Sequence, residues 1–169
     1  MPNWCDNTIT ISGPKDKIVA LWETAKTSQQ GEFGLLEAMV PLGEWSYDEA
    51  VTQWGCKWDI NDEGLHLEID GELAVITGWA QSAWSPPIDA MLTYQEANTD
   101  IEIRLAYYEP GLDFIGVYQD GEDHHYTELS EMILKNSQAE DTVFADLIEE
   151  FGCEDSFNDE VNLEEDLAQ

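Results

Sequence analysis

Two short segments of the chain hold side chains that could bind a metal ion. In the first, Asp59 to Gly64, oxygen-bearing side chains occupy the first, third and fifth positions and glycine the sixth, as in an EF-hand calcium loop. The twelfth position is Asp70 instead of glutamate, and the residues after Gly64 alternate between apolar and polar. Because the calcium loop requires flanking helices, we expect Asp59 to Gly64 to be a turn that enters a strand.

The second segment, Asp120 to His125, combines three carboxylates with two adjacent histidines. Adjacent side chains on an extended chain point to opposite faces, so His124 and His125 are poorly placed to bind one metal ion. We therefore expect a solvated turn, with a weak metal site as the alternative. His66, on the polar face of an expected strand, is interpreted as an ordinary surface histidine.

The sequence contains no catalytic motif. The phosphate-binding loops GxGxxG, GxxxxGKS and GxxxxGKT are absent. A hydrolase would need a nucleophile beside a base, or two carboxylates in an apolar cleft, and 37 acidic residues make chance pairs of carboxylates unavoidable. We predict no catalytic residue, no metal and no cofactor, and a metal-dependent enzyme is the third of the functions considered.

Charge is the strongest functional signal. The chain of 169 residues has 37 Asp and Glu against 6 Lys and Arg, which gives a formal net charge of -31. Such a surface repels nucleic acid and anionic membranes, and it attracts basic protein surfaces. No Lys or Arg follows Lys135. The residues expected to bind a partner are acidic residues of this last part: Glu140, Asp141, Asp146, Glu149, Glu150, Glu154, Asp155, Asp159 and Glu160.

The cysteines indicate the compartment. Cys5, Cys56 and Cys153 are widely spaced and form no CxxC pair, which argues against a disulfide framework and against a zinc site. No apolar run is long enough to span a membrane, and the N-terminus lacks the pattern of a signal peptide. We expect a cytoplasmic protein.

The elements that position these groups follow from the apolar pattern. The expected strands are 4–12, 65–70, 73–80, 101–108 and 112–118. The strand 73–80 is apolar on both faces and is placed inside the sheet. Asp70-Gly71 predicts a hairpin, and Ser85 with Pro86 predicts a capped helix start. Further helices are expected from Lys15 or Asp16, after Thr127 and after Asp141.

This order predicts an α+β fold, a ferredoxin-like two-layer sandwich with helices on one face of a mainly antiparallel sheet. The expected domain covers residues 1–126, with an insertion of one or two short helices at about 32–64. Residues 127–169 are expected to be an acidic helical extension whose last residues are disordered. Clustered aromatic residues usually belong to a core. We therefore expect burial of five tryptophans: Trp4, Trp54, Trp58, Trp79 and Trp84. For Trp84, which precedes the segment Ser85-Pro86-Pro87, the alternative is a place in an exposed groove.

Several strings together resemble the YubB-type ferredoxin-like domain family of plasmids and phages. They are MPNWC with Asn7 and Gly13-Pro14, WGCKWD at 54–59, AWSPP at 83–87, and Tyr108-Glu109 before Phe114 and Gly116. The resemblance covers about residues 1–120. It implies a ferredoxin-like fold and a mobile-element origin, and it implies no established activity. Cys56 and the acidic tail depart from the family pattern.

Charge and resemblance together favour a non-enzymatic accessory protein of a phage or other mobile element. It would bind, and inhibit, a basic nucleic-acid-binding host protein by presenting carboxylates as DNA presents phosphates. It would bind no nucleic acid directly. The alternative is a structural or oligomerisation module whose charge reflects only solubility or a salty milieu.

Overall fold

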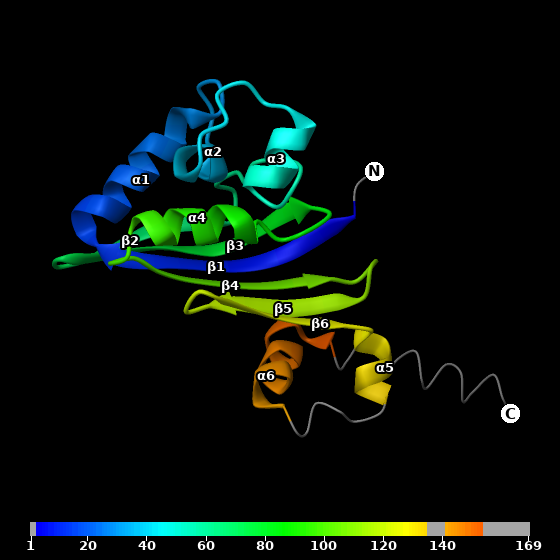
Figure 1. The fold of residues 1–169 in the computed structure, drawn as a ribbon. Helices are drawn as coiled ribbons and strands as arrows, with labels where there is room; N and C mark the ends of the chain where they lie inside the picture. The colour runs from blue at the N-terminus through cyan, green and yellow to red at the C-terminus, as the bar shows by residue number, and fades with distance from the viewer. Residues whose placement is uncertain (1–2, 135–140, 154–169) are drawn as a thin grey trace, which may run out of the picture.

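A computed structural model describes residues 3–134 and 141–153 of the chain (Figure 1). Within them, the strands are β1 (Trp4–Pro14), β2 (Leu65–Asp70), β3 (Leu73–Ala83), β4 (Glu102–Glu109), β5 (Phe114–Gln119) and β6 (Glu122–Thr127). The helices are α1 (Lys15–Ser28), α2 (Leu35–Met39), α3 (Tyr47–Gln53), α4 (Ile88–Ala97), α5 (Leu129–Leu134) and α6 (Thr142–Phe151). None of the helices described is long and apolar enough to cross a membrane.

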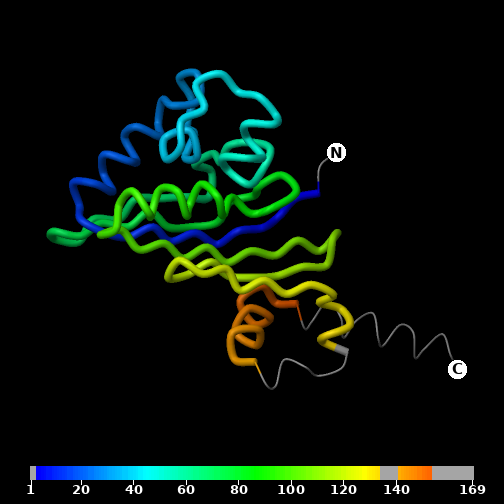
Figure 2. The backbone as a smooth tube through the Cα atoms, viewed as in Figure 1, coloured from blue at the N-terminus to red at the C-terminus, as the bar shows by residue number. Residues whose placement is uncertain are grey.

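The strands form one antiparallel sheet in the order β2-β3-β1-β4-β5-β6. The long central pair, β1 and β3, runs side by side from Trp4 opposite Ala83 to Pro14 opposite Leu73. Because β3 lies between β2 and β1, its prediction as an internal strand is confirmed. The backbone trace in Figure 2 shows β1 crossing the middle of the molecule and the N-terminus at one end of the sheet.

Two hydrophobic cores lie on opposite faces of the sheet. On β4 the side chains alternate: Ile103, Leu105 and Tyr107 belong to the first core, whereas Ala106 belongs to the second. Figure 1 shows α1, α2, α3 and α4 on one side of the sheet and α5 and α6 on the other. The second core joins Phe144, Leu147 and Ile148 of α6 to β4 and β5. We predicted two layers, with helices on one face of the sheet. The structure has a third layer, because α5 and α6 cover the other face.

Two local predictions need correction. The expected solvated turn at Asp120 to His125 contains a turn only at its start, because Glu122 onward forms the edge strand β6. The strand β6 is held extended by hydrogen bonds to β5. Because its side chains are mostly polar, its sequence lacks the apolar alternation by which a strand is predicted. The helix expected at Pro86 begins at Ile88, and Ser85 Oγ donates to the carbonyl of Gly55 instead of capping that helix.

Other local predictions are confirmed. Asp59 to Gly64 leads directly into β2, as a strand-entry turn should. Residues 32–64, which were predicted to hold one or two short helices, contain α2 and α3. The hairpin at Asp70-Gly71 joins β2 to β3, and Gly71 has the positive φ of 60° that such tight turns require.

Candidate functional site

Exposed tryptophans mark one part of the surface. Trp54 is buried, and its Nε1 donates to the Val40 carbonyl at 2.9 Å. Five others expose between 39% and 48% of their area: Trp58, Trp4, Trp45, Trp84 and Trp79. The expectation that Trp4, Trp58, Trp79 and Trp84 belong to the core is therefore wrong, and it is correct for Trp54. Their indole rings remain available for contact with another molecule.

Three of the strings that carry the family resemblance, MPNWC, WGCKWD and AWSPP, meet at this end of the sheet. The backbone N–H of Trp84 donates to the carbonyl of Asn3 at 2.8 Å, which joins the end of β3 to the N-terminus. Ser85 Oγ donates to Gly55, so the same end of β3 also contacts the insertion. Trp84 has a φ of 76°, a left-handed conformation that is rare for a bulky residue. Such outliers persist where the surroundings over-determine them, often at binding sites.

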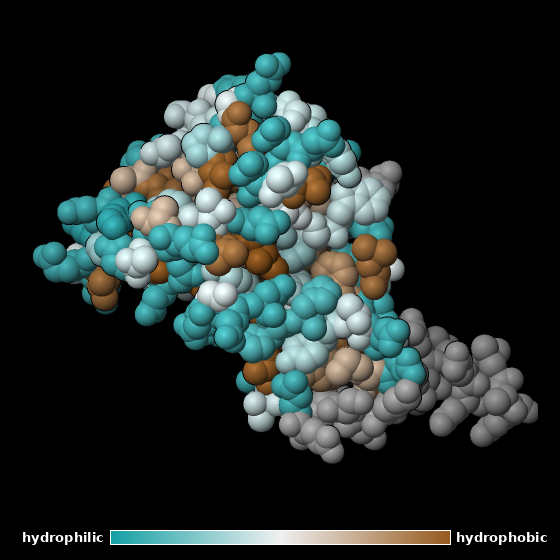
Figure 3. Space-filling view, viewed as in Figure 1, coloured by the Kyte–Doolittle hydropathy of each residue, from teal (hydrophilic) through white to brown (hydrophobic). Residues whose placement is uncertain are grey.

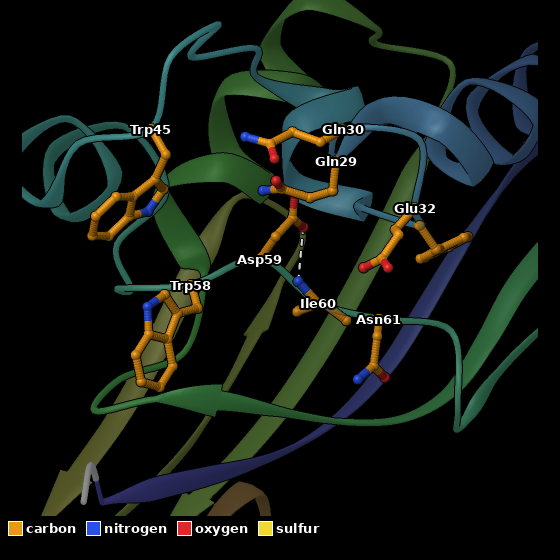
Figure 4. A pocket seen from close by; sticks show the side chains of 9 residues that line it. Gln29, Gln30, Glu32, Trp45, Trp58, Asp59, Ile60 and Asn61 are labelled. Carbon is orange, nitrogen blue, oxygen red and sulfur yellow. Dashed lines mark hydrogen bonds between the residues drawn. The ribbon is translucent and has the colours of Figure 1, made fainter.

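Trp58 stands between two hollows. The larger, about 460 Å³, is lined by Trp45 and Trp58 together with polar residues that include Gln29, Glu32 and Asn61. Figure 4 shows the rings of Trp45 and Trp58 on one side of this hollow and Glu32 and Asn61 on the other. The smaller, about 220 Å³, lies where the end of β3 has no β2 residue beside it. Its walls include Trp4, Trp58, Trp79, Glu63 and Gln81.

Contacts around Trp58 hold these rings in place. The Trp4 and Trp58 ring centroids are 6.0 Å apart with planes tilted by 41°. The Lys57 ammonium lies 4.4 Å from the centroid of the Trp58 ring, within the range of a cation–π interaction. Trp45 Nε1 donates to the Lys57 carbonyl at 3.0 Å. The rings of Trp4 and Trp45 are therefore both held against the backbone segment of Lys57 and Trp58.

Asp59 anchors that segment to α2. Its carboxylate accepts hydrogen bonds from the backbone N–H groups of Leu36 at 2.6 Å and Glu37 at 2.9 Å, in the first turn of the helix. It also accepts from the N–H of Ile60 at 2.7 Å and from Gln29 Nε2 at 3.3 Å. Burial raises the pKa of Asp59, and the three backbone hydrogen bonds act in the opposite direction. Asp59 is therefore a helix-capping residue, and this role accounts for a carboxylate at position 59 without requiring a metal ion.

A buried polar cluster lies beneath the same end of the sheet. Asn7 Nδ2 donates to the carbonyls of Cys5 at 3.0 Å and Ala80 at 3.2 Å, and to Ser82 Oγ at 2.9 Å. Asn7 Oδ1 is the one buried side-chain oxygen or nitrogen without a hydrogen-bond partner among the residues described. Burial raises the pKa of the Cys5 thiol to about 12, so Cys5 is a protonated thiol of the core.

The charged side chains that line the two hollows are all acidic among the residues described. The walls of the hollows include the carboxylates of Glu32, Asp59 and Glu63, and no lysine or arginine among the residues described lines either of them. Asp59 is occupied by its hydrogen bonds to α2, whereas Glu63 is exposed. Aromatic faces and carboxylates together favour a cationic group over an anionic one.

The predicted partner-binding residues divide into three groups. Asp141 caps α6 and accepts a hydrogen bond from Tyr126 Oη at 2.9 Å, and Glu150 pairs with Arg104, so both have structural roles. Asp146 and Glu149 of α6 are exposed. The others lie outside the described residues: Glu140, Glu154, Asp155, Asp159 and Glu160.

The Asp120 to His125 segment takes part in a hydrogen-bonded group around Tyr107, away from the two hollows. Tyr107 Oη donates to Asp123 Oδ1 at 2.6 Å and lies 2.8 Å from His125 Nδ1, whereas His124 Nε2 is 3.8 Å from Glu122 on the other side of the strand. The two histidines therefore separate as expected. Within the described residues no three His, Cys, Asp or Glu side chains are grouped to hold a metal ion.

Sequence reasoning missed the exposed tryptophan surface because it assigned aromatic residues to the core by type. It also missed Gln29, Glu32 and Trp45 as neighbours of Trp58. The available signal was the density of tryptophans in WGCKWD and AWSPP, beside glycine and proline residues that bend the chain at the surface.

Comparisons with known proteins place the chain in no family. No protein-family model matches it, and no curated protein matches it. Among solved structures, it is similar to the protein api92 from Yersinia pseudotuberculosis, of the family DUF1281, with 18% sequence identity and a TM-score of 0.37. That likeness covers 54% of this chain and 39% of the api92 chain.

Proposed function

We propose that this chain is a non-enzymatic acidic protein that binds a basic, nucleic-acid-binding host protein and prevents that protein from engaging DNA. The observation that carries the proposal is the charge imbalance, 37 acidic residues against 6 basic ones, on a well-packed fold. Figure 3 displays a face that is largely hydrophilic, with small hydrophobic patches between the polar side chains. Such a surface favours a cationic partner and disfavours nucleic acid.

Internal pairing leaves the carboxylates in large excess. Lys17 pairs with Asp100 at 2.6 Å and Lys26 with Glu23 at 2.8 Å, and Arg104 pairs with Glu150. Lys57 lies over Trp58. Four of the six basic residues are therefore engaged with this chain's own side chains, and the field felt by a partner is that of the carboxylates.

A ferredoxin-like unit, β1-α1-β2-β3-α4-β4, is part of the proposal. Its support is the strand order β2-β3-β1-β4, with α1 and α4 packed against one face of these strands. The origin in a phage or plasmid rests on the resemblance of the sequence strings alone. A cytoplasmic location is proposed because all three cysteines are buried and free.

Displacement of a basic protein from DNA tests the function. A fluorescent DNA duplex is bound to a bacterial nucleoid-associated protein of high isoelectric point, and the full chain is titrated in at low and raised salt. We expect release of the DNA at low salt and weaker release as salt screens the carboxylates. Absence of release at every salt concentration, with this and with nuclease or polymerase complexes, would reject the proposal.

Variants locate the acidic contact. Asp146→Asn with Glu149→Gln removes two exposed charges from α6, and Asp70→Asn with Glu72→Gln removes two from the β2–β3 hairpin as a control. We expect the α6 pair to weaken displacement more than the hairpin pair. Equal effects would mean that overall charge acts without a defined α6 surface.

The structural-module alternative predicts something different. If the charge is only an adaptation to a salty milieu, the chain should need molar salt to fold and should displace no basic protein. Circular dichroism in dilute buffer and in molar salt distinguishes the two.

A further inference from the structure

We infer that the surface formed by Trp4, Trp45, Trp58 and Trp79 with Glu32 and Glu63 binds arginine side chains of an extended basic segment. We call it the tryptophan surface. The inference rests on the proposed function and adds to it a second partner contact, apart from the acidic one expected on α6. Its members come from β1, β3 and the insertion.

The first argument is the shape of the tryptophan surface. Two hollows of about 460 and 220 Å³ share Trp58, Asp59 and Asn61, so one segment can place side chains on both sides of the Trp58 ring. The larger lies in the range of about 300–1,000 Å³ that is usual for ligand pockets. Trp4, the end of β3 that extends beyond β2, and residues of the segment 58–64 form the walls of the smaller one.

The second argument is that the chain itself places a cation there. Lys57 Nζ lies 4.4 Å from the centroid of Trp58, so the face of this ring already attracts a positive charge. Lys57 is only partly buried, and its flexible side chain can move aside. We interpret it as an internal stand-in for the partner's cation.

The third argument concerns the type of cation. A guanidinium stacks flat on an indole ring and donates in its plane to oxygen acceptors. The larger hollow provides such acceptors on its other walls, in the carboxylate of Glu32 and the amide oxygen of Asn61 across from the rings (Figure 4), and in the amide oxygen of Gln29. A lysine ammonium would use the charge but not the planar stacking, so arginine is preferred.

The fourth argument is that the rings are held before binding. Trp45 Nε1 bonds to the Lys57 carbonyl at 3.0 Å, and Asp59 fixes the adjacent backbone on α2 at 2.6 and 2.9 Å. Pre-arranged aromatic rings lose little conformational entropy when a ligand binds. A phosphate-bearing ligand is disfavoured by the carboxylates, and a neutral ligand would leave Glu32 and Glu63 unused.

Calorimetry with short capped peptides tests the inference directly. The peptides alternate serine with arginine, with lysine, or with citrulline, which has the shape of arginine without its charge. We expect the arginine peptide to bind most tightly, the lysine peptide less tightly and the citrulline peptide not measurably. Equal binding of arginine and citrulline peptides, or binding of oligosaccharides in their place, would overturn the inference.

Matched tryptophan variants locate the binding site. Trp58→Leu and Trp84→Leu remove rings of similar exposure, but only Trp58 lines the hollows. We expect Trp58→Leu to weaken arginine-peptide binding about fivefold, the worth of one cation–π contact at a partly exposed site, and Trp84→Leu to leave it unchanged. Circular dichroism checks that both variants fold. Equal losses would overturn the inference.

Lys57 provides a test with the opposite sign. Lys57→Met and Lys26→Met both remove one positive charge, but only the first uncovers the Trp58 ring. We expect Lys57→Met to bind the arginine peptide more tightly than Lys26→Met does. If the two variants bind alike, Lys57 is not a stand-in and the inference fails on this point.

The inference and the proposed function fail in different ways. If DNA displacement succeeds while Trp58→Leu has no effect on it or on peptide binding, the tryptophan surface is not the contact and the proposed function stands. If the arginine peptide binds at Trp58 while no basic protein is displaced from DNA, the surface binds cations and the proposed function falls.

Discussion

The guanidinium of Arg104 on β4 donates two hydrogen bonds to the carboxylate of Glu150 on α6, at 3.1 and 2.7 Å. Arg104 is the only arginine in the chain. Its hydrogen bonds to Glu150 raise the pKa of the guanidinium, which stays charged. The pair fastens α6 to the face of the sheet that carries the second core, and it removes Glu150 from the carboxylates open to a partner.

Breaking this pair should loosen α6. Glu150→Gln is expected to lower the free energy of unfolding by about 1 kcal/mol, a modest value because water screens the partly exposed guanidinium. Urea unfolding at low and high salt measures it. Glu149→Gln, one residue away and exposed, is the control, with an expected change within about 0.5 kcal/mol. An equal loss in both variants would show that the pair contributes nothing specific.

The N-cap of α6 should make stability depend on pH. Hydrogen bonds from the backbone N–H groups of Phe144 and Val143 hold the pKa of Asp141 below its usual 3.8, aided by Tyr126 Oη. Since the folded pKa is the lower one, this stabilisation is present above the usual pKa and is lost as pH falls through the folded pKa. Asp141→Ala should cost about 1 kcal/mol at neutral pH and less in acid.

Asp141→Asn separates the cap from its charge. The asparagine oxygen can still accept the two backbone hydrogen bonds, so little stability should be lost at neutral pH. The difference between Asp141→Asn and the parent chain should vanish as pH falls, as chemical unfolding at several pH values would record. If Asp141→Ala is as stable as the parent at neutral pH, the cap does not contribute.

Gly116 is required by the path of Tyr107. A Cβ at Gly116 would lie 2.2 Å from the Tyr107 hydroxyl, which passes over β5 to reach Asp123 on β6. Gly116→Ala should therefore displace the ring or the edge strand and destabilise the fold by about 2 kcal/mol. Thermal unfolding, together with faster amide exchange along β6, would report it.

Gly121→Ala is the control for Gly116→Ala. Gly121 has a φ of 77° but has nothing within 4 Å of an added Cβ, so its cost is conformational strain alone, about 1 kcal/mol. If Gly116→Ala costs no more than Gly121→Ala, the contact with Tyr107 does not constrain the strand.

Removing the cap from α2 should affect the larger hollow. Asp59→Ala leaves the N–H groups of Leu36 and Glu37 without their acceptor, and we expect a loss of about 2 kcal/mol. Amide exchange at these two residues should accelerate, and the arginine peptide should bind more weakly because the Trp58 segment is released. Asp62→Ala, an exposed change in the same turn, should leave all three readings unchanged.

Local pattern sufficed wherever neighbouring residues decide the structure. The alternation of Leu65, Leu67 and Ile69, the Asp70-Gly71 turn and the apolar stripe of Ile18 and Leu21 predicted β2, the hairpin and α1 because period and turn chemistry are properties of short segments. The strand β6 could not be found this way, since its polar side chains are extended only because β5 offers hydrogen-bonding partners.

At the candidate site, too, the sequence indicates which residues are unusual, whereas their roles depend on contacts between distant parts of the chain. Asp59 attracts attention in the sequence as a possible metal ligand, yet its role as the cap of α2 depends on a helix more than twenty residues earlier in the chain. Trp58 looks like a core residue by type, but it is exposed because the insertion places it at the rim of the sheet beside Trp4.

The sequence by itself determined the large negative charge, the α+β class and most of the strands, because these depend on composition and on periods within a few residues. Only the tertiary structure decided which tryptophans are exposed, that α5 and α6 cover the second face, and which carboxylates are already paired. Burial and pairing depend on contacts between residues far apart in the chain, and a local pattern carries no information about those contacts.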